Sequence, residues 1–317
     1  MERPFFPPVF DSTLLAAIRS CPQKAYRTYL QHWKPKTESV HLVAGAAFAS
    51  GIEAARKAFF EENAPKEDAE AVGLKALIEH YGDFEPVVDT AKTLDRMCGA
   101  LEFYFDQYQL GEDGMTPVVL ASGKPAVEMS FSHPLPIAHP ETGDPLIYAG
   151  RMDAVMEFAG GIYPVDEKTT SSLGPSWSRQ WEMRSQFTGY AWACREDGLN
   201  VDGCIVRGVS ILKTKYETQQ VVTNRASWEI DRWYEQTLRD IERFMRCWEE
   251  GYYDYALDTA CLEYGGCGMV QVCKSPNPDS WLPMYFEKKV WDPLTRALIT
   301  EEEWQRQWRN TPSVIAA

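Results

Sequence analysis

The stretch GRMDAVMEFAGGIYPVDEKTT, residues 150–170, determines the expected fold. Two runs of mainly apolar residues flank Gly160 and Gly161, a pattern typical of two antiparallel strands joined by a tight turn. If the two glycines form a two-residue turn, Lys168 of the second strand lies opposite Asp153 of the first. The stretch therefore predicts a β-hairpin that brings charged residues of both strands together.

Three charged residues, Asp166, Glu167 and Lys168, stand side by side in the second run. Because side chains alternate along a strand, Asp166 and Lys168 share a face with Asp153, and Glu167 faces the other way. Carboxylates are expensive to bury, but they suit Mg²⁺ or Mn²⁺, and an ammonium beside them can position a water. The alternative is a surface hairpin with solvated charges. A bulge at Pro164, which cannot donate to the ladder, would shift the pairing by one residue.

The composition is that of a soluble globular protein of 317 residues, with 44% hydrophobic and 25% charged residues. No window approaches the roughly 18 apolar residues of a membrane span, and the N-terminus lacks the pattern of a signal peptide, so we expect a cytoplasmic protein without a membrane partner.

The net charge of -14 argues against a broad basic surface for nucleic acid. Bound metal ions can nevertheless reverse the sign of a carboxylate-rich site.

The front third of the chain has the apolar spacing of helices. A first helix, capped by Asp11 or Ser12, ends near Cys21, and a second begins after Pro22. Further helices are expected at residues 43–63, 67–81 and 86–109.

Strand patterns begin at Pro117 and are followed by a mixture of helices and strands. The expected strands are residues 117–122, 126–132, 146–158, 161–170, 204–214, 216–223 and 284–291. The expected later helices are residues 176–196, residues 226–250 and one at the C-terminus. This order predicts a single α/β domain over residues 1–317, with a helical part at 1–115, a mixed-sheet core at 116–225 and a helix plus a cysteine-rich region at 226–317.

Three motifs along the core resemble the RecB-type branch of the PD-(D/E)XK nuclease superfamily. That family's pattern is G-x-x-D, a turn, D-x-K-T and then Q-x-x-x-Y, and its order and spacing are matched throughout. The matching residues are Gly150, Asp153, Asp166, Lys168, Thr169, Gln186 and Tyr190. The resemblance implies a restriction-endonuclease-like core and a DNA nuclease that hydrolyses phosphodiesters with Mg²⁺ or Mn²⁺.

The resemblance also implies roles for the residues of the hairpin. Asp153 and Asp166 would be metal ligands, and the backbone carbonyl of Glu167 would add a third oxygen. Lys168 would position the attacking water.

Other positions match the family less closely. Gln186 and Tyr190, at i and i+4 on one helix face, would hold the site or the DNA backbone, with helix packing as the alternative for Tyr190. Glu128 lies where relatives often carry a site glutamate; the alternative is an exposed strand residue.

Relatives often have a metal-binding histidine where this chain has Ala49, and Glu53, one turn later, is the candidate replacement ligand. A solvated helix glutamate is its alternative, so the number of catalytic metals stays open.

Four of the eight cysteines form a candidate cluster site. Cys261, Cys267 and Cys273 are six residues apart with glycines between them, and Cys21 with Pro22 resembles a segment of iron-sulfur members of this nuclease group. Those members include the CRISPR-associated adaptation exonuclease and AddB-type nuclease domains. The resemblance implies a 4Fe-4S cluster held by these four cysteines. A Cys₄ zinc site is the alternative that spacing alone does not separate.

Aromatic and basic residues precede Gln186 and are candidates for base stacking and phosphate contacts with single-stranded DNA, with core packing as the alternative for at least one tryptophan. They are Trp177, Arg179, Trp181 and Arg184. We therefore expect an exonuclease on single-stranded DNA or DNA ends, of a phage or bacterial recombination or repair system, with a recombination or CRISPR-adaptation protein as partner. The rival is a non-catalytic, nuclease-like scaffold that binds DNA or a partner. The sequence leaves open the polarity of degradation, the strand preference, exonuclease versus endonuclease action and the oligomeric state.

Overall fold

In the computed structural model of the chain, residues 3–86, 88–257, 259–262, 266–295 and 297–308 are described. The chain forms two compact units, each built from segments that are distant in sequence. The first unit comprises Met1–Thr37, Phe131–Gly150 and Arg232–Ala317, and the second comprises Glu38–Ser130 and Arg151–Asp231. All candidate catalytic residues lie in the second unit, and all four candidate cluster cysteines lie in the first.

Three helices begin the second unit: α3 (Val40–Phe60), α4 (Lys66–Tyr81) and α5 (Leu94–Gln107). They enclose an apolar cluster of fully or almost fully buried side chains. Two glycines allow α3 and α4 to approach closely, because a Cβ on Gly73 would lie 2.6 Å from the carbonyl oxygen of Gly51. This close approach leaves no room for a side chain at either glycine.

The central sheet is mixed, as the sequence predicts. Its strands are β1 (Val9–Phe10), β3 (Met115–Pro117), β4 (Val127–Ala138), β5 (Pro145–Phe158), β6 (Gly161–Thr170), β7 (Gly203–Ile211) and β8 (Tyr216–Asn224). The order is β1-β5-β6-β7-β8, and β3 and β4 also pair with β5. Strands β6 and β7 are parallel, whereas β5 with β6 and β7 with β8 are antiparallel. The α/β class with a mixed sheet flanked by helices is confirmed.

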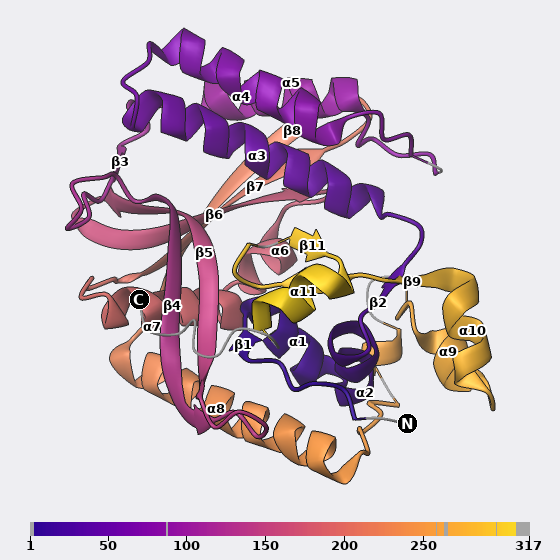
Figure 1. The fold of residues 1–317 in the computed structure, drawn as a ribbon. Coiled ribbons are helices and arrows are strands. Elements are labelled where there is room, and N and C mark those ends of the chain that lie inside the picture. The colour runs from indigo at the N-terminus through magenta and orange to yellow at the C-terminus, as the bar shows by residue number, and fades with distance from the viewer. Residues whose placement is uncertain (1–2, 87, 258, 263–265, 296, 309–317) are drawn as a thin grey trace. The chain divides into compact units, whose positions relative to one another are not determined.

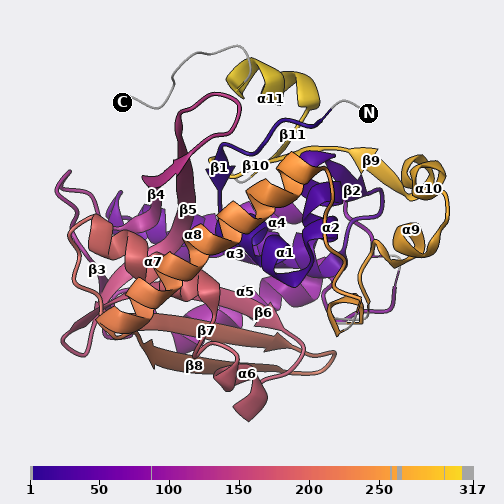
Figure 2. The same cartoon turned by 90° about the horizontal axis from the view of Figure 1, so that it is seen from below.

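Helices cover both faces of the sheet in the second unit, which explains why every residue of β7 is buried. On one face, Val209 and Ile211 join the apolar cluster of α3, α4 and α5. On the other face lie α6 (Pro175–Arg179) and α7 (Ser185–Glu196), where the Cys204 thiol donates to the Phe187 carbonyl at 3.2 Å. Figures 1 and 2 show these two groups of helices beside β6, β7 and β8.

The β5–β6 hairpin forms as predicted, but its turn lies one residue earlier. Phe158 pairs with Gly161, so the turn is formed by Ala159 and Gly160, with φ of 50° and 85°. Positive φ at both positions is the type I′ geometry that suits a twisted hairpin. Gly161 belongs to the strand, where a Cβ would lie 2.7 Å from Asp202 Oδ2.

This register corrects the expected pairing of Lys168 with Asp153. Ala154 pairs with Val165, so Asp153 and Asp166 are the next residues along the two strands. Pro164 pairs with Val155 within an unbroken register, so no bulge shifts the ladder there.

The first unit packs N-terminal elements against the C-terminal part of the chain. Its helices are α1 (Ser12–Ser20), α2 (Pro22–Ala25), a π-helical turn (Tyr26–Leu30), α8 (Ser227–Glu250, which begins in the second unit), a 3₁₀ turn (Thr259–Cys261), α9 (Val270–Lys274), α10 (Pro278–Tyr285) and α11 (Glu301–Trp308). Its short strands are β2 (Trp33–Pro35), β9 (Phe286–Lys288), β10 (Val290–Asp292) and β11 (Ala297–Ile299). Asp11 caps α1 as predicted, accepting a hydrogen bond from the Leu14 N–H at 2.7 Å. The Phe6 ring packs against Phe10, Phe244 and Trp248, which joins residues far apart in the sequence.

Two expected helices differ from the structure. The helix expected at 86–109 begins only at Leu94, after Thr93, whose side chain caps it. The helix expected at 176–196 is interrupted between α6 and α7, where the Arg225 guanidinium donates to the Trp181 carbonyl at 2.7 Å. Along the described ranges, no helix has both the length and the apolar character needed to span a membrane.

Candidate active site

The D-x-K motif on β6 places a carboxylate and an ammonium in direct contact. The Lys168 side chain forms an ion pair with Asp166. The Asp166 side chain is 4% exposed, whereas that of Lys168 is 34% exposed. The ammonium is therefore reachable from solvent, while the carboxylate beside it is sheltered.

Asp153 on β5 lies against the same part of β6. Its Oδ2 accepts a hydrogen bond from the Glu167 N–H at 3.2 Å. Burial raises the pKa of Asp153 well above its ordinary value, and the neighbouring charges of Asp166 and Glu167 raise it further. A cation at this position would relieve the repulsion between the carboxylates.

The donor set of this site fits a magnesium-like ion. Mg²⁺ is commonly held by one or two carboxylates, with waters and substrate phosphates as its other ligands, and Asp153 and Asp166 supply two. Within the part of the chain that the structure describes, no group of three or more His, Cys, Asp or Glu side chains is placed so that it could hold a metal ion. With two protein carboxylates as ligands, such an ion would take its other ligands from water and substrate.

Glu167 points to the opposite face, into a buried network with α3 and α5. Arg56 Nη1 donates to its Oε2 at 3.0 Å, Arg56 Nη2 bonds its Oε1, and the Tyr104 hydroxyl donates to Oε1 at 3.0 Å. Arg207 donates to the Tyr104 hydroxyl at 3.4 Å and pairs with Asp113 at 2.7 Å. Burial alone would raise the pKa of Glu167, but the charge and hydrogen bonds of Arg56 hold it below its ordinary value. Nothing in the sequence near Arg56 or Tyr104 indicates this network, because its members come from distant segments.

Arg151 connects the two other candidate glutamates. Its Nε lies 2.6 Å from Glu128 Oε2, and its Nη2 lies 3.6 Å from Glu53 Oε2. Glu53 also pairs with Lys57 at 2.5 Å. Glu128 has a φ of 53°, a backbone conformation that a non-glycine residue rarely adopts, and its side chain is 8% exposed. Both glutamates therefore lie beside Arg151, a residue that no sequence motif indicated.

The Q-x-x-x-Y motif on α7 is bonded to the backbone of β5. The Gln186 amide donates to the Tyr190 hydroxyl at 2.8 Å, and this hydroxyl donates to the Arg151 carbonyl at 3.0 Å. Tyr190 is buried. The pair thus fixes the strand that carries Asp153.

A buried lysine outside the motifs contacts the same strand. Lys92 donates to Thr169 Oγ1 at 2.9 Å, and burial lowers its pKa to about 8. Gly45 on α3 lies against this hydroxyl, because a Cβ there would be 3.8 Å from Thr169 Oγ1. The D-x-K-T threonine therefore joins β6 to the loop before α5.

The candidate DNA-binding residues divide into two classes. Trp177 and Trp181 are buried, pack edge-to-face with ring centroids 5.3 Å apart, and Trp181 also contacts Phe187. Arg179 and Arg184 are exposed. The two arginines are therefore available to a phosphate backbone, whereas the indole rings contribute to the core beneath them.

Three of the candidate cluster cysteines, Cys21, Cys261 and Cys267, lie near the fourth, Cys273, in the first unit. Burial raises the pKa of the Cys273 thiol, and the neighbouring Cys21, Cys267 and Cys261 raise it further. The Cys267 N–H donates to the Cys261 carbonyl at 2.9 Å. All four are free thiols, and in the described segments no three of them are placed so that they could hold a metal ion. Four sulfur donors from both ends of the chain suit either an iron-sulfur cluster or zinc.

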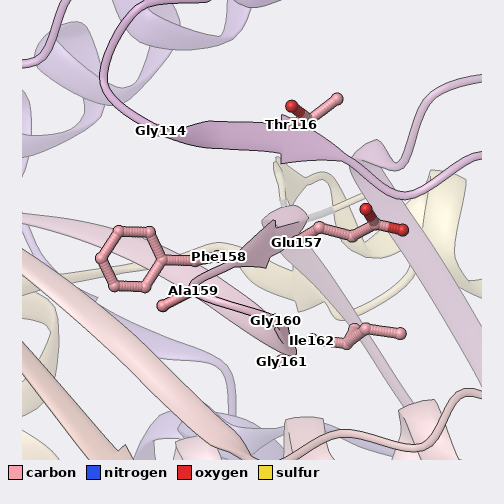
Figure 3. A pocket seen from close by; sticks show the side chains of 8 residues that line it. All are labelled: Gly114, Thr116, Glu157, Phe158, Ala159, Gly160, Gly161 and Ile162. Carbon is pink, nitrogen blue, oxygen red and sulfur yellow. The ribbon is translucent and has the colours of Figure 1, made fainter.

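A pocket of about 480 Å³ lies at the tip of the β5–β6 hairpin. Figure 3 shows its lining, in which Thr116 and Glu157 present side-chain oxygens and the turn around Gly160 presents backbone. Glu157 is the one ionisable group among the eight lining residues. The pocket therefore lacks the paired carboxylates and ammonium of the D-x-K region.

Residues 13–274 match a family model described as the PD-(D/E)XK nuclease superfamily. No curated protein matches the chain. One similar solved structure is a "Putative exonuclease" from Eubacterium rectale, with a TM-score of 0.48 and 13% sequence identity over 80% of this chain and 87% of that chain. Another is SSO0001, with a TM-score of 0.26 and 13% identity over 60% of this chain and 74% of that chain. At these scores neither structure bears on function.

Proposed function

Because the chain belongs to the PD-(D/E)XK nuclease superfamily, we propose that it is a divalent-metal-dependent deoxyribonuclease with its active site at Asp153, Asp166 and Lys168. The observation that carries the proposal is the grouping of the buried Asp166 carboxylate and the half-buried Asp153 carboxylate with a partly exposed ammonium on β5 and β6. The order of the G-x-x-D, D-x-K-T and Q-x-x-x-Y motifs supports its assignment to the RecB-type branch.

The proposed reaction is hydrolysis of a phosphodiester bond by water. Asp153, Asp166 and the backbone carbonyl of Glu167 are the oxygens that would hold Mg²⁺ or Mn²⁺. The bound ion would supply Lewis-acid stabilisation of the phosphate charge. Lys168 contacts Asp166 and is open to solvent, so its ammonium can orient a water for attack on phosphorus. The Glu167 N–H keeps the Asp153 carboxylate directed toward β6.

We further propose exonuclease action on single-stranded DNA or DNA ends. Arg179 and Arg184, exposed just before Gln186, are suited to phosphate contacts. A chain with a net charge of -14 needs such local positive groups to hold DNA.

For the cysteine site we propose a 4Fe-4S cluster on Cys21, Cys261, Cys267 and Cys273. The nearness of three thiols to Cys273 supports this proposal. Thiolates from both ends of the chain would link α1 and α2 to the C-terminal region. A brown protein with acid-labile sulfide is expected after anaerobic purification, and a colourless protein containing zinc would contradict the cluster.

The nuclease proposal is tested with labelled single-stranded DNA and Mn²⁺, comparing wild type with Lys168→Ala and Asp166→Ala. Wild type should degrade the DNA and both variants should lose activity, because each lacks a group that acts at the phosphate. Lys75→Ala is the matched control, since this lysine on α4 is 76% exposed and pairs only loosely with Glu79. Degradation of substrates that are blocked at the 5′ or the 3′ end shows the end from which the enzyme degrades DNA. Equal activity in wild type and Lys168→Ala, or none in either, would reject the enzyme in favour of a non-catalytic scaffold.

A further inference from the structure

Arg151 pairs with two glutamates and lies on the strand that carries Asp153 of the proposed metal site. It is two residues before Asp153 on β5, a separation of about 6.5 Å along an extended strand. Its guanidinium lies 2.6 Å from Glu128 Oε2 and 3.6 Å from Glu53 Oε2. The Arg151 side chain is 33% exposed, so a ligand from solvent can reach it.

The two glutamates are already neutralised by basic side chains. One oxygen of Glu53 lies against Arg151 and the other lies 2.5 Å from Lys57. Glu128 adopts a left-handed backbone conformation at the start of β4, and its buried carboxylate meets Arg151 there. A strained backbone at a charged residue is a feature that clusters at functional sites.

The backbone of Arg151 is also held in place. The Tyr190 hydroxyl donates to its carbonyl at 3.0 Å, and Gln186 in turn donates to Tyr190 at 2.8 Å. A guanidinium fixed through both its side chain and its main chain is preorganised, so it loses little entropy when it meets a phosphate.

We propose that Arg151 is a catalytic residue that contacts the scissile phosphate as a fixed positive charge, so that the enzyme works with one divalent ion. Glu53 and Glu128 bind the Arg151 guanidinium and hold no second ion. The inference rests on the proposed nuclease function and names the positive charges at the same site, which are one divalent ion and the Arg151 guanidinium.

The reaction gives this charge a role. Water forms a bond to phosphorus, the bond from phosphorus to a deoxyribose oxygen breaks, the water loses one proton and the leaving oxygen gains one. Negative charge increases on the phosphate oxygens in the transition state, and a preorganised guanidinium stabilises it.

The test combines metal binding with kinetics in wild type, Arg151→Gln and Arg151→Lys. Mn²⁺ binding is followed by electron paramagnetic resonance titration of the full-length protein, and cleavage of single-stranded DNA gives kcat and KM. Wild type should bind one Mn²⁺. Arg151→Gln should bind a second Mn²⁺, because Glu128 and Glu53 lose their cation, and adding Glu128→Gln should remove it. The kcat of Arg151→Gln should fall by about 100-fold or more.

Arg195→Gln is the matched control, since Arg195 makes an exposed pair with Asp231 and should leave both readouts unchanged. Arg151→Lys keeps the charge and serves if Arg151→Gln does not fold; it should bind one Mn²⁺ and recover part of kcat. Two results would overturn this inference but leave the proposed function intact. In one, wild type cleaves DNA with two bound Mn²⁺; in the other, Arg151→Gln or Arg151→Lys keeps the kcat of wild type. Wild type that neither binds Mn²⁺ nor cleaves DNA overturns the proposed function and this inference with it.

Discussion

Breaking the buried ion pair between Arg56 and Glu167 is expected to destabilise the second unit strongly. The two side chains are 4% and 1% exposed, and Tyr104 provides a further hydrogen bond to the carboxylate. Glu167→Leu would leave the Arg56 charge buried without its partner, which costs about 3–5 kcal/mol. The double change Arg56→Met with Glu167→Leu removes both charges and should recover most of that loss, because apolar replacement of a buried pair is often close to neutral.

The assay is urea unfolding of wild type, both single variants and the double variant, giving the coupling energy of the pair. We expect a coupling of at least about 2 kcal/mol. The control cycle uses Arg195→Met and Asp231→Leu, whose exposed pair should couple by less than about 1 kcal/mol. A Glu167→Leu protein as stable as wild type, or a double variant whose loss equals the sum of the two single losses, would refute the reasoning.

Three further expectations concern other parts of the chain. Burial, together with Lys288 and Lys34, lowers the pKa of His32 to about 4, so stability should be lost as the pH falls from about 6.5 to 4, by about 3 kcal/mol. His32→Asn should lack this loss of stability when unfolding is measured as a function of pH, since asparagine tolerates the φ of 61° at this position. A variant whose stability depends on pH in the same way as that of wild type would contradict the assignment to His32. Cys273→Ser should lower the amount of iron bound per protein, whereas Cys98→Ser should not. Equal iron contents in the two variants would reject the proposed cluster site. Tyr190→Phe, which loses the bond to the β5 backbone, should lower kcat more than it raises KM, and unchanged kinetics would assign Tyr190 to packing alone.

Local chemistry made the hairpin and the first helix predictable. The cap at Asp11 and the strands on either side of the glycine pair depend on neighbours in sequence, and both are found. The turn position differed because Ala159 adopts a positive φ that alanine rarely favours, while Gly161 is needed in the strand against Asp202.

Contacts between distant segments could not be predicted. At the break between α6 and α7 the Trp181 carbonyl accepts a hydrogen bond from Arg225, which lies more than forty residues later in the sequence. The alternation of β6 predicted that Glu167 faces away from Asp166, but not that Arg56 of α3 binds it, since a helical arginine is most often solvated.

The first unit also constrains the order in which the chain can fold during synthesis. The Trp248 indole donates to the Pro4 carbonyl at 2.7 Å, across 244 positions of sequence. At about 5–20 residues per second, the ribosome needs about 12–50 s to supply this partner. Throughout that interval the apolar side chains around Phe6 and Phe10 lack the α8 residues that cover them. The part of the core around Phe6 can therefore close only after α8 has been synthesised.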